Sequence, residues 1–503
     1  MPQPNILVFM ADQMLGDVSR PDHPCITPNM ERLAAQGVRF ENTFCTAPHC
    51  CPSRASFFTG QMPSVHGVWN NVSNRCAISR GLNEGVATLG EILGPAGYNL
   101  GFSGKWHVSD FQNPSDLGWT EYALTAPKDR WQHSRIEMYD EASRRPAAPH
   151  NPRDIRRPGW GEREIYGPMS EEEHRNGNDV NTVAQARRAI EELAAKGGPW
   201  CVFASCTAPH DTYQVPQRYL DLYEGMDVPL PASFSDDLKD KPRIYQRMRR
   251  QYWDQLSPDQ TREAIKHYWA MCSMVDGYLG ELLDTLDRTG QAENTIVVFT
   301  SDHGDYTGAH GIWCKGVPSF REAYAIPGIV RWPAATKDPG RTVSDLVSVC
   351  DFFPTFVEAA TGKAPDVFGD SLLPFLRGER PEGWRDALFS QMNGVELYYT
   401  QRMVWTRQWK YVYNGFDFDE MYDLESDPGE TVNLADPERY DQSVPERGGE
   451  YVPWPRMTPE LEAVREEMYG RLWAFACEQQ DHFIYTPYLT TAQATYGPAL
   501  AVK

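Results

Sequence analysis

The sequence has no excess of positive charge. It holds 48 lysines and arginines against 69 aspartates and glutamates, which gives a formal net charge of −21. Nucleic-acid binding depends on a basic face, so we expect no nucleic-acid partner. A small anionic substrate is still compatible with this charge, because the residues that line a pocket can have the opposite sign to the whole protein.

Long hydrophobic runs are also missing. No apolar run approaches the roughly 18 residues that a membrane-spanning helix needs, so we expect no membrane association. Residues 1–4 lead directly into the apolar segment 5–10, without the basic region, long apolar region and small-residue cleavage site of a signal peptide. We therefore expect a cytoplasmic protein.

Cysteine pairs with metal-binding or redox spacing are absent as well. The chain has 11 cysteines, an odd number, and no Cys-x-x-Cys pattern, so we expect most of them to be reduced. Cys201, Cys206 and Cys272 lie in apolar segments, where a cysteine packs as a small hydrophobic side chain. Cys50 and Cys51 are adjacent, and neighbouring cysteines form a disulfide only with strain, which argues against a redox pair.

Apolar strand patterns alternate with helical patterns over most of the chain. Strands are predicted at 5–10, 98–102, 200–205 and 295–300, and helices from Thr27 (the N-cap) onward and at 89–93, 179–195 and 260–286. The segment 5–10 is apolar throughout, which is typical of a strand buried on both faces. This alternation predicts an α/β fold with a large, mostly parallel mixed sheet flanked by helices.

The chain changes character after about residue 380. Short aromatic-rich segments predict an antiparallel meander, followed by a helix, at 387–391, 397–405, 409–413, 420–424 and 460–478. A chain of 503 residues is long enough for one large domain and a smaller one. We predict a catalytic α/β domain at 1–380, and an α+β subdomain with an antiparallel sheet and a tail at 381–503.

An irregular segment interrupts the larger domain. Residues 144–168 are rich in Pro, Arg and Gly and show no periodicity, so we predict an irregular insertion that covers the sheet beside a substrate. The tail after His482 is apolar and aromatic without periodicity. We expect it to lie over a neighbouring subunit of a homo-oligomer, either a dimer or a tetramer.

Polar side chains directly follow the predicted strands, at Asp12, Lys105, His210 and Asp302. The carboxyl ends of parallel strands share one edge of a sheet, where ligands bind, so we expect these side chains to converge. Gln13 and His303 stand next to the two aspartates. Carboxylate, amide and imidazole groups suit a divalent cation, although an aspartate at a strand end also commonly caps the next helix.

The segment from Cys50 to Gly60 has the features of an anion site. Pro52 fits the first turn of a helix and Gly60 fits its end. Cys50 therefore lies at a helix N-terminus, whose N–H groups and dipole favour an anion. Arg54 follows one turn later on the same face and adds a fixed positive charge beside a reactive side chain.

The spacing Cys50-x-Pro52-Ser53-Arg54, followed by Thr59-Gly60, resembles the signature of the formylglycine-dependent sulfatases of the alkaline-phosphatase-like superfamily. Further matches occur in order along nearly the whole chain, at Asp12, Gly104 to His107, His210, Asp302-His303 and Lys315. The resemblance implies the alkaline-phosphatase-like fold and hydrolysis of a sulfate monoester. It also implies that a formylglycine-generating maturation enzyme oxidises Cys50 to formylglycine, whose hydrate is the nucleophile.

The same resemblance implies one divalent metal ion, with Asp12, Gln13, modified Cys50, Asp302 and His303 as ligands. Many members of the family have Asp in place of Gln13 and Asn in place of His303. The pair in this chain is closer to the phosphonate monoester hydrolase and choline-sulfatase branches. Calcium is the first expectation, and manganese is the alternative because imidazole favours it.

Roles for the remaining residues also follow from the resemblance. Lys105 contacts the sulfate, and Lys315 neutralises its charge. His107 assists the nucleophile, His210 contacts the ester oxygen, and either His210 or Lys315 assists the departure of the alcohol. Asn71 matches a substrate-binding amide of the phosphonate hydrolases. A solvated surface lysine and a structural histidine are the alternatives for Lys105 and His210.

We therefore predict a sulfatase that acts on a small anionic ester. A phosphonate monoester hydrolase or phosphodiesterase with the same site is the alternative, because these substrates share their shape and their single negative charge. A non-catalytic anion-binding protein, in which Cys50 is never oxidised, is a third hypothesis. No motif identifies the alcohol part of the substrate, which stays open between aryl, choline and sugar.

Overall fold

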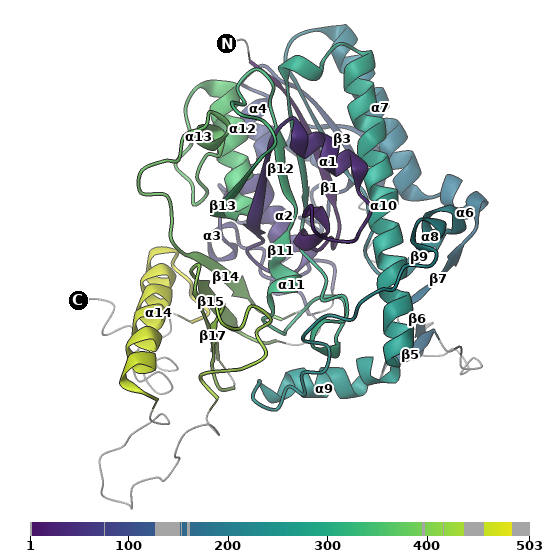
Figure 1. Cartoon of the computed structure of the whole chain (residues 1–503). Coiled ribbons are helices and arrows are strands. Elements are labelled where there is room, and N and C mark those ends of the chain that lie inside the picture. Colours follow the sequence, from purple (N-terminus) through teal and green to yellow (C-terminus); the bar gives the residue numbers. More distant parts are fainter. Residues whose placement is uncertain are drawn as a thin grey trace, which may run out of the picture.

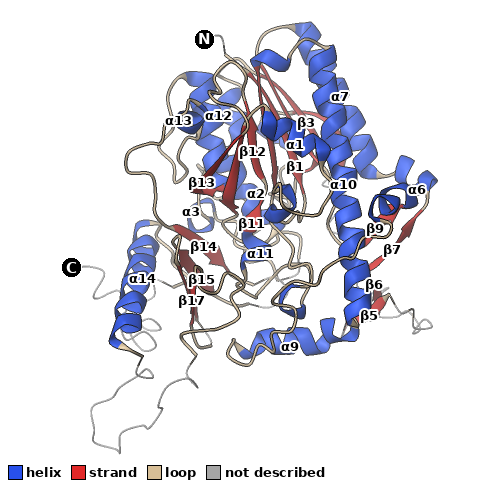
Figure 2. Ribbon diagram, in the orientation of Figure 1, coloured by secondary structure: helices blue, strands red, loops and turns tan. Residues whose placement is uncertain are grey.

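A large mixed sheet forms the centre of the molecule. The computed structural model describes residues 3–74, 76–125, 151, 153–157, 161–394, 398–415, 417–436 and 457–484. The sheet lies between two layers of helices (Figures 1 and 2) and has the order β11-β2-β12-β10-β1-β8-β3-β4, with β13 also beside β2. Its strands are β1 Asn5–Ala11, β2 Val38–Phe44, β3 Asn99–Lys105, β4 Thr120–Thr125, β8 Trp200–Ser205, β10 Thr295–Ser301, β11 Ala325–Ile326, β12 Gly328–Arg331 and β13 Arg341–Ser348.

The central strands of this sheet run parallel. β1 pairs in parallel with β10 on one side and with β8 on the other, and β3 pairs in parallel with β8 and β4. β12 is antiparallel to both β10 and β2. The predicted mixed, mostly parallel sheet is therefore confirmed, and the carboxyl ends of β1, β3, β8 and β10 lie at one edge.

Alternate side chains of β1 pack into two different apolar clusters. Ile6 and Val8 belong to the cluster beneath one helical layer, and Leu7 and Phe9 belong to the cluster beneath the other. The strand is buried on both faces, as its uninterrupted apolar sequence predicts. The first layer contains α2 Cys50–Thr59, α4 Leu89–Leu93 and α12 Phe352–Thr361, and the second contains α1 Pro28–Ala35, α7 Asn178–Lys196 and α10 Pro258–Arg288.

The helix predicted after Thr27 is present as α1, but Thr27 does not cap it through its side chain. Asp276 of α10 instead accepts hydrogen bonds from the backbone N–H groups of Asn29 and Met30, at 3.0 and 2.7 Å. A carboxylate from a neighbouring helix thus satisfies the unpaired donors at the start of α1, a contact that local sequence does not encode.

The predicted irregular insertion is more regular than its composition indicates. Residues 126–150, and with them the start of the predicted segment, lie outside the described residues. The rest contains an antiparallel hairpin of β5 (Asp154–Arg157) and β6 (Gly161–Glu164), and β7 (Tyr166–Met169), which pairs in parallel with β9 (Tyr213–Pro216). The prediction of an irregular segment was wrong here. These short strands contribute few apolar side chains to the core, such as the buried Ile155 and, next to the strands, Ile165, so the sequence shows no periodic apolar pattern.

A second, antiparallel sheet follows the large one in sequence and lies below it in Figure 1. Its order is β14-β15-β16-β17, which confirms the predicted meander. Val404 and Tyr411 of this sheet pack with Leu472 and Trp473 of the last helix. The bounds are β14 Leu388–Met392, β15 Gln401–Trp405, β16 Trp409–Asn414, β17 Glu420–Asp423 and α14 Pro459–Glu478. The tail beyond residue 484 lies outside the described residues, and the boundary at 380/381 stays a prediction.

Shorter helices connect these elements: α3 Pro63–His66, α6 Glu171–Arg175, α8 Gln217–Leu220, α9 Arg243–Gln251, α11 Arg321–Tyr324 and α13 Leu373–Leu376. Among the described residues, none of the helices combines the length and the apolar character needed to cross a membrane.

Candidate active site

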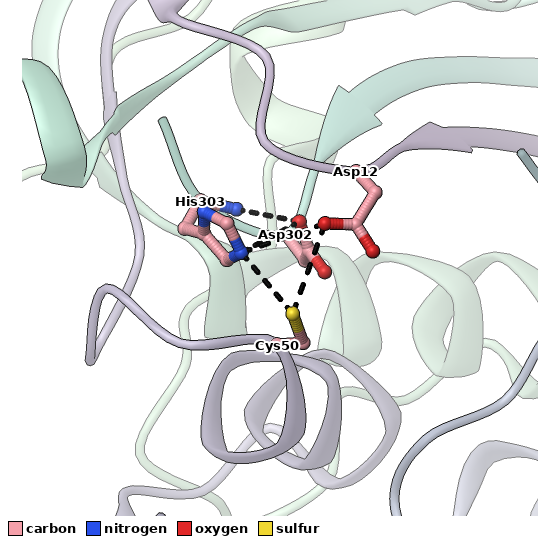
Figure 3. Close-up of side chains that lie close together, drawn as sticks. All are labelled: Asp12, Cys50, Asp302 and His303. Carbon is pink, nitrogen blue, oxygen red and sulfur yellow. Dashed lines mark hydrogen bonds and ion pairs between the residues drawn. The ribbon is translucent and has the colours of Figure 1, made fainter. Parts of the chain in front are cut away.

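The N-terminus of α2 faces the edge of the sheet where β1 and β10 end. Cys50 is the first residue of α2, and Gly60 closes the helix in a left-handed conformation with φ 67°. A Cβ atom at Gly60 would lie 2.8 Å from the side chain of Phe353, so glycine suits both the backbone and the packing. Asp12 follows β1 directly and Asp302 follows β10, which brings both carboxylates opposite Cys50 (Figure 3).

Four buried side chains form a compact cluster at this point. The ligand atoms of Asp12, Cys50, Asp302 and His303 all lie within 4.8 Å of one another. The Cys50 Sγ atom is 3.3 Å from His303 Nε2 and 3.7 Å from Asp12 Oδ1 (Figure 3). Carboxylates, an imidazole and a sulfur (or the oxygen that replaces it after oxidation) are a suitable donor set for a divalent cation.

The orientation of His303 supports this interpretation. Its Nδ1 atom lies 2.9 Å from the backbone carbonyl of Gly304, to which Nδ1–H donates a hydrogen bond. Nε2 is therefore left with its lone pair directed at the cluster, 3.5 Å from Asp302 Oδ1. Metal-binding histidines are commonly fixed in this way through the other ring nitrogen. The residues present thus fit a divalent ion.

Arg54 contacts the carboxylates of the cluster and the neighbouring strand ends. Its guanidinium donates to Asp302 Oδ2 at 2.7 Å and to Asp12 Oδ2 at 3.3 Å. It also donates to the carbonyl of Lys105 and to Ser205 Oγ, each at 2.9 Å. These contacts hold the carboxylates of Asp12 and Asp302 in place, and the expected contribution of Arg54 to anion binding stays a prediction.

Lys105 reaches the same cluster from the end of β3. Its ammonium group forms an ion pair with Asp12 Oδ2. Burial and the adjacent Cys50 act to raise the pKa of Asp12, but the ammonium group of Lys105, the neighbouring His210 and the guanidinium of Arg54 outweigh them and hold this pKa below its usual value. Asp12 is therefore a carboxylate at neutral pH, as a metal ligand must be.

The surroundings of Cys50 favour its thiolate. Burial acts to raise the pKa of the thiol, but the charges of Lys105 and Lys315, the neighbouring His303 and a hydrogen bond with His107 hold this pKa well below its ordinary value. Cationic neighbours lower a thiol pKa because they stabilise the negative sulfur. His107 also lies close to Ser73, with 3.2 Å between Nε2 and Oγ.

His210 lies beside Cys50 and is fixed by the next residue in the chain. Its Nδ1 atom is 2.8 Å from the backbone carbonyl of Asp211 and 3.1 Å from the carboxylate oxygen Oδ1. Burial, together with the charge of Lys315, lowers the pKa of His210 to about 4, although Asp12 and Cys50 oppose this shift. In this state of the protein the imidazole is neutral at pH 7.

Lys315 and Gln13 contact each other directly, with 2.6 Å between Nζ and Oε1. The amide nitrogen of Gln13 donates to Asp305 Oδ2 at 2.6 Å and to Asp211 Oδ1 at 3.2 Å. The amide oxygen of Gln13 therefore faces the cationic side of the site, and its assignment as a metal ligand stays a prediction.

Asn71 lies at the start of α2, where its side-chain oxygen accepts a hydrogen bond from the backbone N–H of Cys51 at 3.1 Å. This contact orients the first turn of the helix and thus Cys50. The contact of Asn71 with substrate stays a prediction.

Sequence reasoning missed the acidic residues that surround Gln13. Asp305 is fully buried and accepts hydrogen bonds from Gln13, from the Tyr213 hydroxyl at 2.5 Å and from two backbone N–H groups. Its position three residues after Asp302 was the available signal. Asp211 directly follows His210 in the sequence, and nothing in the local pattern indicates that Arg163 pairs with it.

Comparison with known proteins identifies the family. The family model described as Sulfatase matches residues 4–363. The chain belongs to the sulfatase family. A second model, described as N-sulphoglucosamine sulphohydrolase, C-terminal, matches residues 308–447 of this sulfatase.

Individual relatives agree with this assignment. The sulfatase is 30% identical to a choline-sulfatase of Rhizobium meliloti (strain 1021) over 459 residues, which cover 86% of this chain and 83% of the relative. It is 26% identical to an arylsulfatase of Clostridium perfringens (strain 13 / Type A) over 476 residues, or 88% of this chain and 92% of the relative. The chain is therefore a sulfuric ester hydrolase.

Solved structures show the shared fold. The phosphonate monoester hydrolase of Agrobacterium radiobacter aligns with a TM-score of 0.73 at 23% identity, covering 95% of this chain and 96% of that chain. A second phosphonate monoester hydrolase, from Silicibacter pomeroyi, has a TM-score of 0.73 at 20% identity and covers 96% of this chain and 97% of that chain. These two structures show the shared fold, and the expected similarity to the choline-sulfatases is confirmed by the relative from Rhizobium meliloti.

Proposed function

We propose that this sulfatase cleaves a sulfate monoester with a formylglycine formed from Cys50. The observation that carries the proposal is the position of the Cys50 side chain, at the start of α2 and within 3.3 Å of His303 and 3.7 Å of Asp12. A divalent ion held by Asp12, Asp302, His303 and residue 50 would act as a Lewis acid and offset the negative charge of the sulfate group.

The chemistry of sulfate transfer explains why a modified cysteine suits this position. A serine or thiol nucleophile would leave a stable sulfated enzyme that water must attack at sulfur. A formylglycine hydrate carries two hydroxyl groups on one carbon. After one has displaced the alcohol at sulfur, loss of the proton from the other expels sulfate by C–O cleavage and regenerates the aldehyde.

The residues around Cys50 have complementary tasks in this proposal. Lys105 and Lys315 lie close enough to lower the pKa of residue 50, and the same charges would stabilise the negative oxygens of the transferred group. His107 and His210 both contact residue 50 and would move protons to and from the nucleophile and the departing alcohol. Arg54 would keep the carboxylates of Asp12 and Asp302 in their ligand positions.

Peptide mass spectrometry tests the proposal directly. Protein produced with a formylglycine-generating enzyme is expected to carry an aldehyde at position 50 and to hydrolyse an aryl sulfate. Protein that retains the thiol is expected to be inactive, and a chelator is expected to remove activity that calcium or manganese then restores. Full activity in the unmodified protein, or in C50A, would contradict the proposal.

Hydrolysis of phosphonate monoesters is the second candidate function. It is favoured by the presence of Gln13 and His303, the pair that resembles the phosphonate hydrolase branch. Turnover of an aryl sulfate is compared with that of the matching aryl phosphonate monoester, and the larger kcat/KM identifies the main activity. A panel of aryl, choline and sugar sulfates then identifies the alcohol.

A further inference from the structure

One carboxylate outside the metal cluster connects several parts of the active site. Asp211 lies between His210, Gln13 and the β5–β6 hairpin, and its side chain is 5% exposed. Its Oδ1 atom is 3.1 Å from His210 Nδ1 and 3.2 Å from Gln13 Nε2. Its Oδ2 atom forms an ion pair with the guanidinium of Arg163, which lies in β6.

Among the described residues, the three partners of this carboxylate are all hydrogen-bond donors. The Gln13 amide nitrogen and the Arg163 guanidinium can only donate, and His210 Nδ1 also lies next to a backbone carbonyl, which can only accept. Nδ1 must therefore carry the proton. A carboxylate suits this position because it offers acceptors alone, whereas an asparagine would place an N–H group against one of these donors.

The consequence for His210 is a fixed tautomer and a fixed ring orientation. With Nδ1–H held between the backbone carbonyl and the carboxylate of Asp211, the other nitrogen, Nε2, is the atom that is available for chemistry beside residue 50. This arrangement parallels the general rule that an acid–base histidine needs a second group to orient it.

Arg163 extends this connection to the inserted hairpin. Its side chain is 32% exposed, so it borders the solvent-facing side of the site while it holds a nearly buried carboxylate. By contrast, the side chain of Arg156 on the neighbouring strand β5 forms an ion pair within the hairpin, with Glu162 at 2.9 Å, and it is 64% exposed.

We propose that Asp211 is a positioning residue that directs His210 Nε2 at the ester oxygen, and that Arg163 of the hairpin holds Asp211 in that position. The proposal rests on the role of His210 given under the proposed function. Nε2, which carries no proton in the free enzyme, takes up the proton that the attacking hydroxyl of residue 50 releases as its oxygen bonds to sulfur, and passes this proton to the departing alcohol as the S–O bond breaks.

A series of sulfate esters with different leaving groups tests this proposal. A poor leaving group depends on protonation, so D211N is expected to lower kcat/KM for phenyl sulfate by roughly 100-fold, within the usual range for general acid catalysis. For 4-nitrophenyl sulfate, whose alcohol departs without a proton, the expected loss is less than roughly 10-fold. R163Q is expected to show the same dependence on the leaving group, with smaller losses of kcat/KM. R156Q, the matched change in the same hairpin, is expected to leave kcat/KM for both substrates unchanged.

A double-mutant comparison shows whether Asp211 acts through His210. Adding D211N to H210A is expected to lower kcat/KM by a far smaller factor than D211N does in the wild-type enzyme, because the imidazole that Asp211 positions is already absent. Equal losses for both leaving groups, or a full additional loss in the H210A background, would overturn the proposal. Because R163Q alters only the partner of the carboxylate, it gives a second route to the same result if D211N does not fold.

An NMR measurement separates this inference from the proposed function. In the unliganded ¹⁵N-histidine-labelled enzyme, the His210 signal, assigned by comparison with H210A, is expected to show a proton on Nδ1. D211N is expected to shift and broaden the two ring-nitrogen signals of His210, because Nδ1–H keeps the backbone carbonyl but loses the carboxylate beside it. Unchanged His210 signals in D211N would overturn the positioning role. An enzyme that shows this shift but turns over no sulfate ester would instead contradict the proposed function alone.

Discussion

Buried charges occur both at the edge of the large sheet and within the small C-terminal sheet, but they are arranged differently. In the small sheet, Arg402 and Asp481 form an ion pair in which each side chain is 1% exposed. The Nη1 group of Arg402 also donates to the carbonyls of Met392 and Gln401 and to Asn393 Oδ1. This pair is complete without any ligand, and it attaches the end of the described chain to β15.

The charges of the active site are not matched in this one-to-one manner. Arg54 and Lys105 share the carboxylates of Asp12 and Asp302, and Cys50 and His303 add further ligand atoms to the same small volume. The comparison shows two roles for buried charges. An ion pair with satisfied hydrogen bonds, such as Arg402–Asp481, stabilises the fold, whereas a cluster whose ligand atoms can still bind a metal ion takes part in catalysis. The predictions below test this distinction.

Loss of the nucleophile is expected to give the largest effect. C50A should lower kcat for an aryl sulfate by at least roughly 10⁴-fold, as removal of a nucleophile does in other hydrolases, while thermal stability stays close to that of the wild type. The neighbouring C51A is the control, since Cys51 is also fully buried but has no predicted role in the reaction. An equal loss of activity in C51A would show that packing of α2, rather than chemistry at residue 50, explains the result.

Breaking the Arg402–Asp481 ion pair is expected to lower stability without lowering activity. D481A leaves the guanidinium of Arg402 buried without its partner, which should lower the free energy of unfolding by about 3–5 kcal/mol. The kcat of the enzyme that remains folded should not change. D386N removes a partner of Arg471 on the surface, where Asp386 is 78% exposed, and should cost less than about 1 kcal/mol. Denaturant unfolding of both variants measures the difference.

Replacing Arg54 tests whether the charges of the active site, unlike the Arg402–Asp481 pair, are coupled to metal binding. R54M should weaken binding of calcium or manganese by roughly 10- to 100-fold, as the loss of groups that orient metal ligands does. It should also destabilise the metal-free protein, because the carboxylates of Asp12 and Asp302 repel each other. Added metal ion should restore part of this stability, whereas it should not restore that of D481A. Metal titrations followed by thermal unfolding distinguish these outcomes.

A pH effect on stability, with no effect on catalysis, is expected from the small sheet. Burial raises the pKa of Asp419 to about 7, against the opposing hydrogen bonds from Tyr411 and Asn414. The folded state therefore binds a proton that the unfolded state has lost, so this residue reduces stability as pH rises from about 4 to about 7, by at most about 1.4 kcal/mol per pH unit. D419N should remove that part of the slope without changing kcat. A slope identical to that of the wild type would contradict this assignment.

Much of the fold could be predicted from local patterns. The strand at 200–205 has the predicted bounds, and the long helix predicted at 260–286 is Pro258–Arg288. Strands could be predicted from apolar segments because burial on both faces of a central strand requires an uninterrupted apolar run. The β5–β6 hairpin could not be predicted in this way, because short strands with few buried side chains leave no periodic signal.

The sequence by itself determined the Cys50 motif, the aspartates at the strand ends and the alternation of strands and helices, because these follow from spacing along the chain. Only the tertiary structure decided which groups Arg54 contacts, that Asp276 caps α1, and that Arg163 reaches Asp211. Arg54 and Asp302, for example, are 248 residues apart in sequence. A hydrogen bond over such a distance depends on how the helices pack against the sheet, and local residue patterns carry no information about that packing.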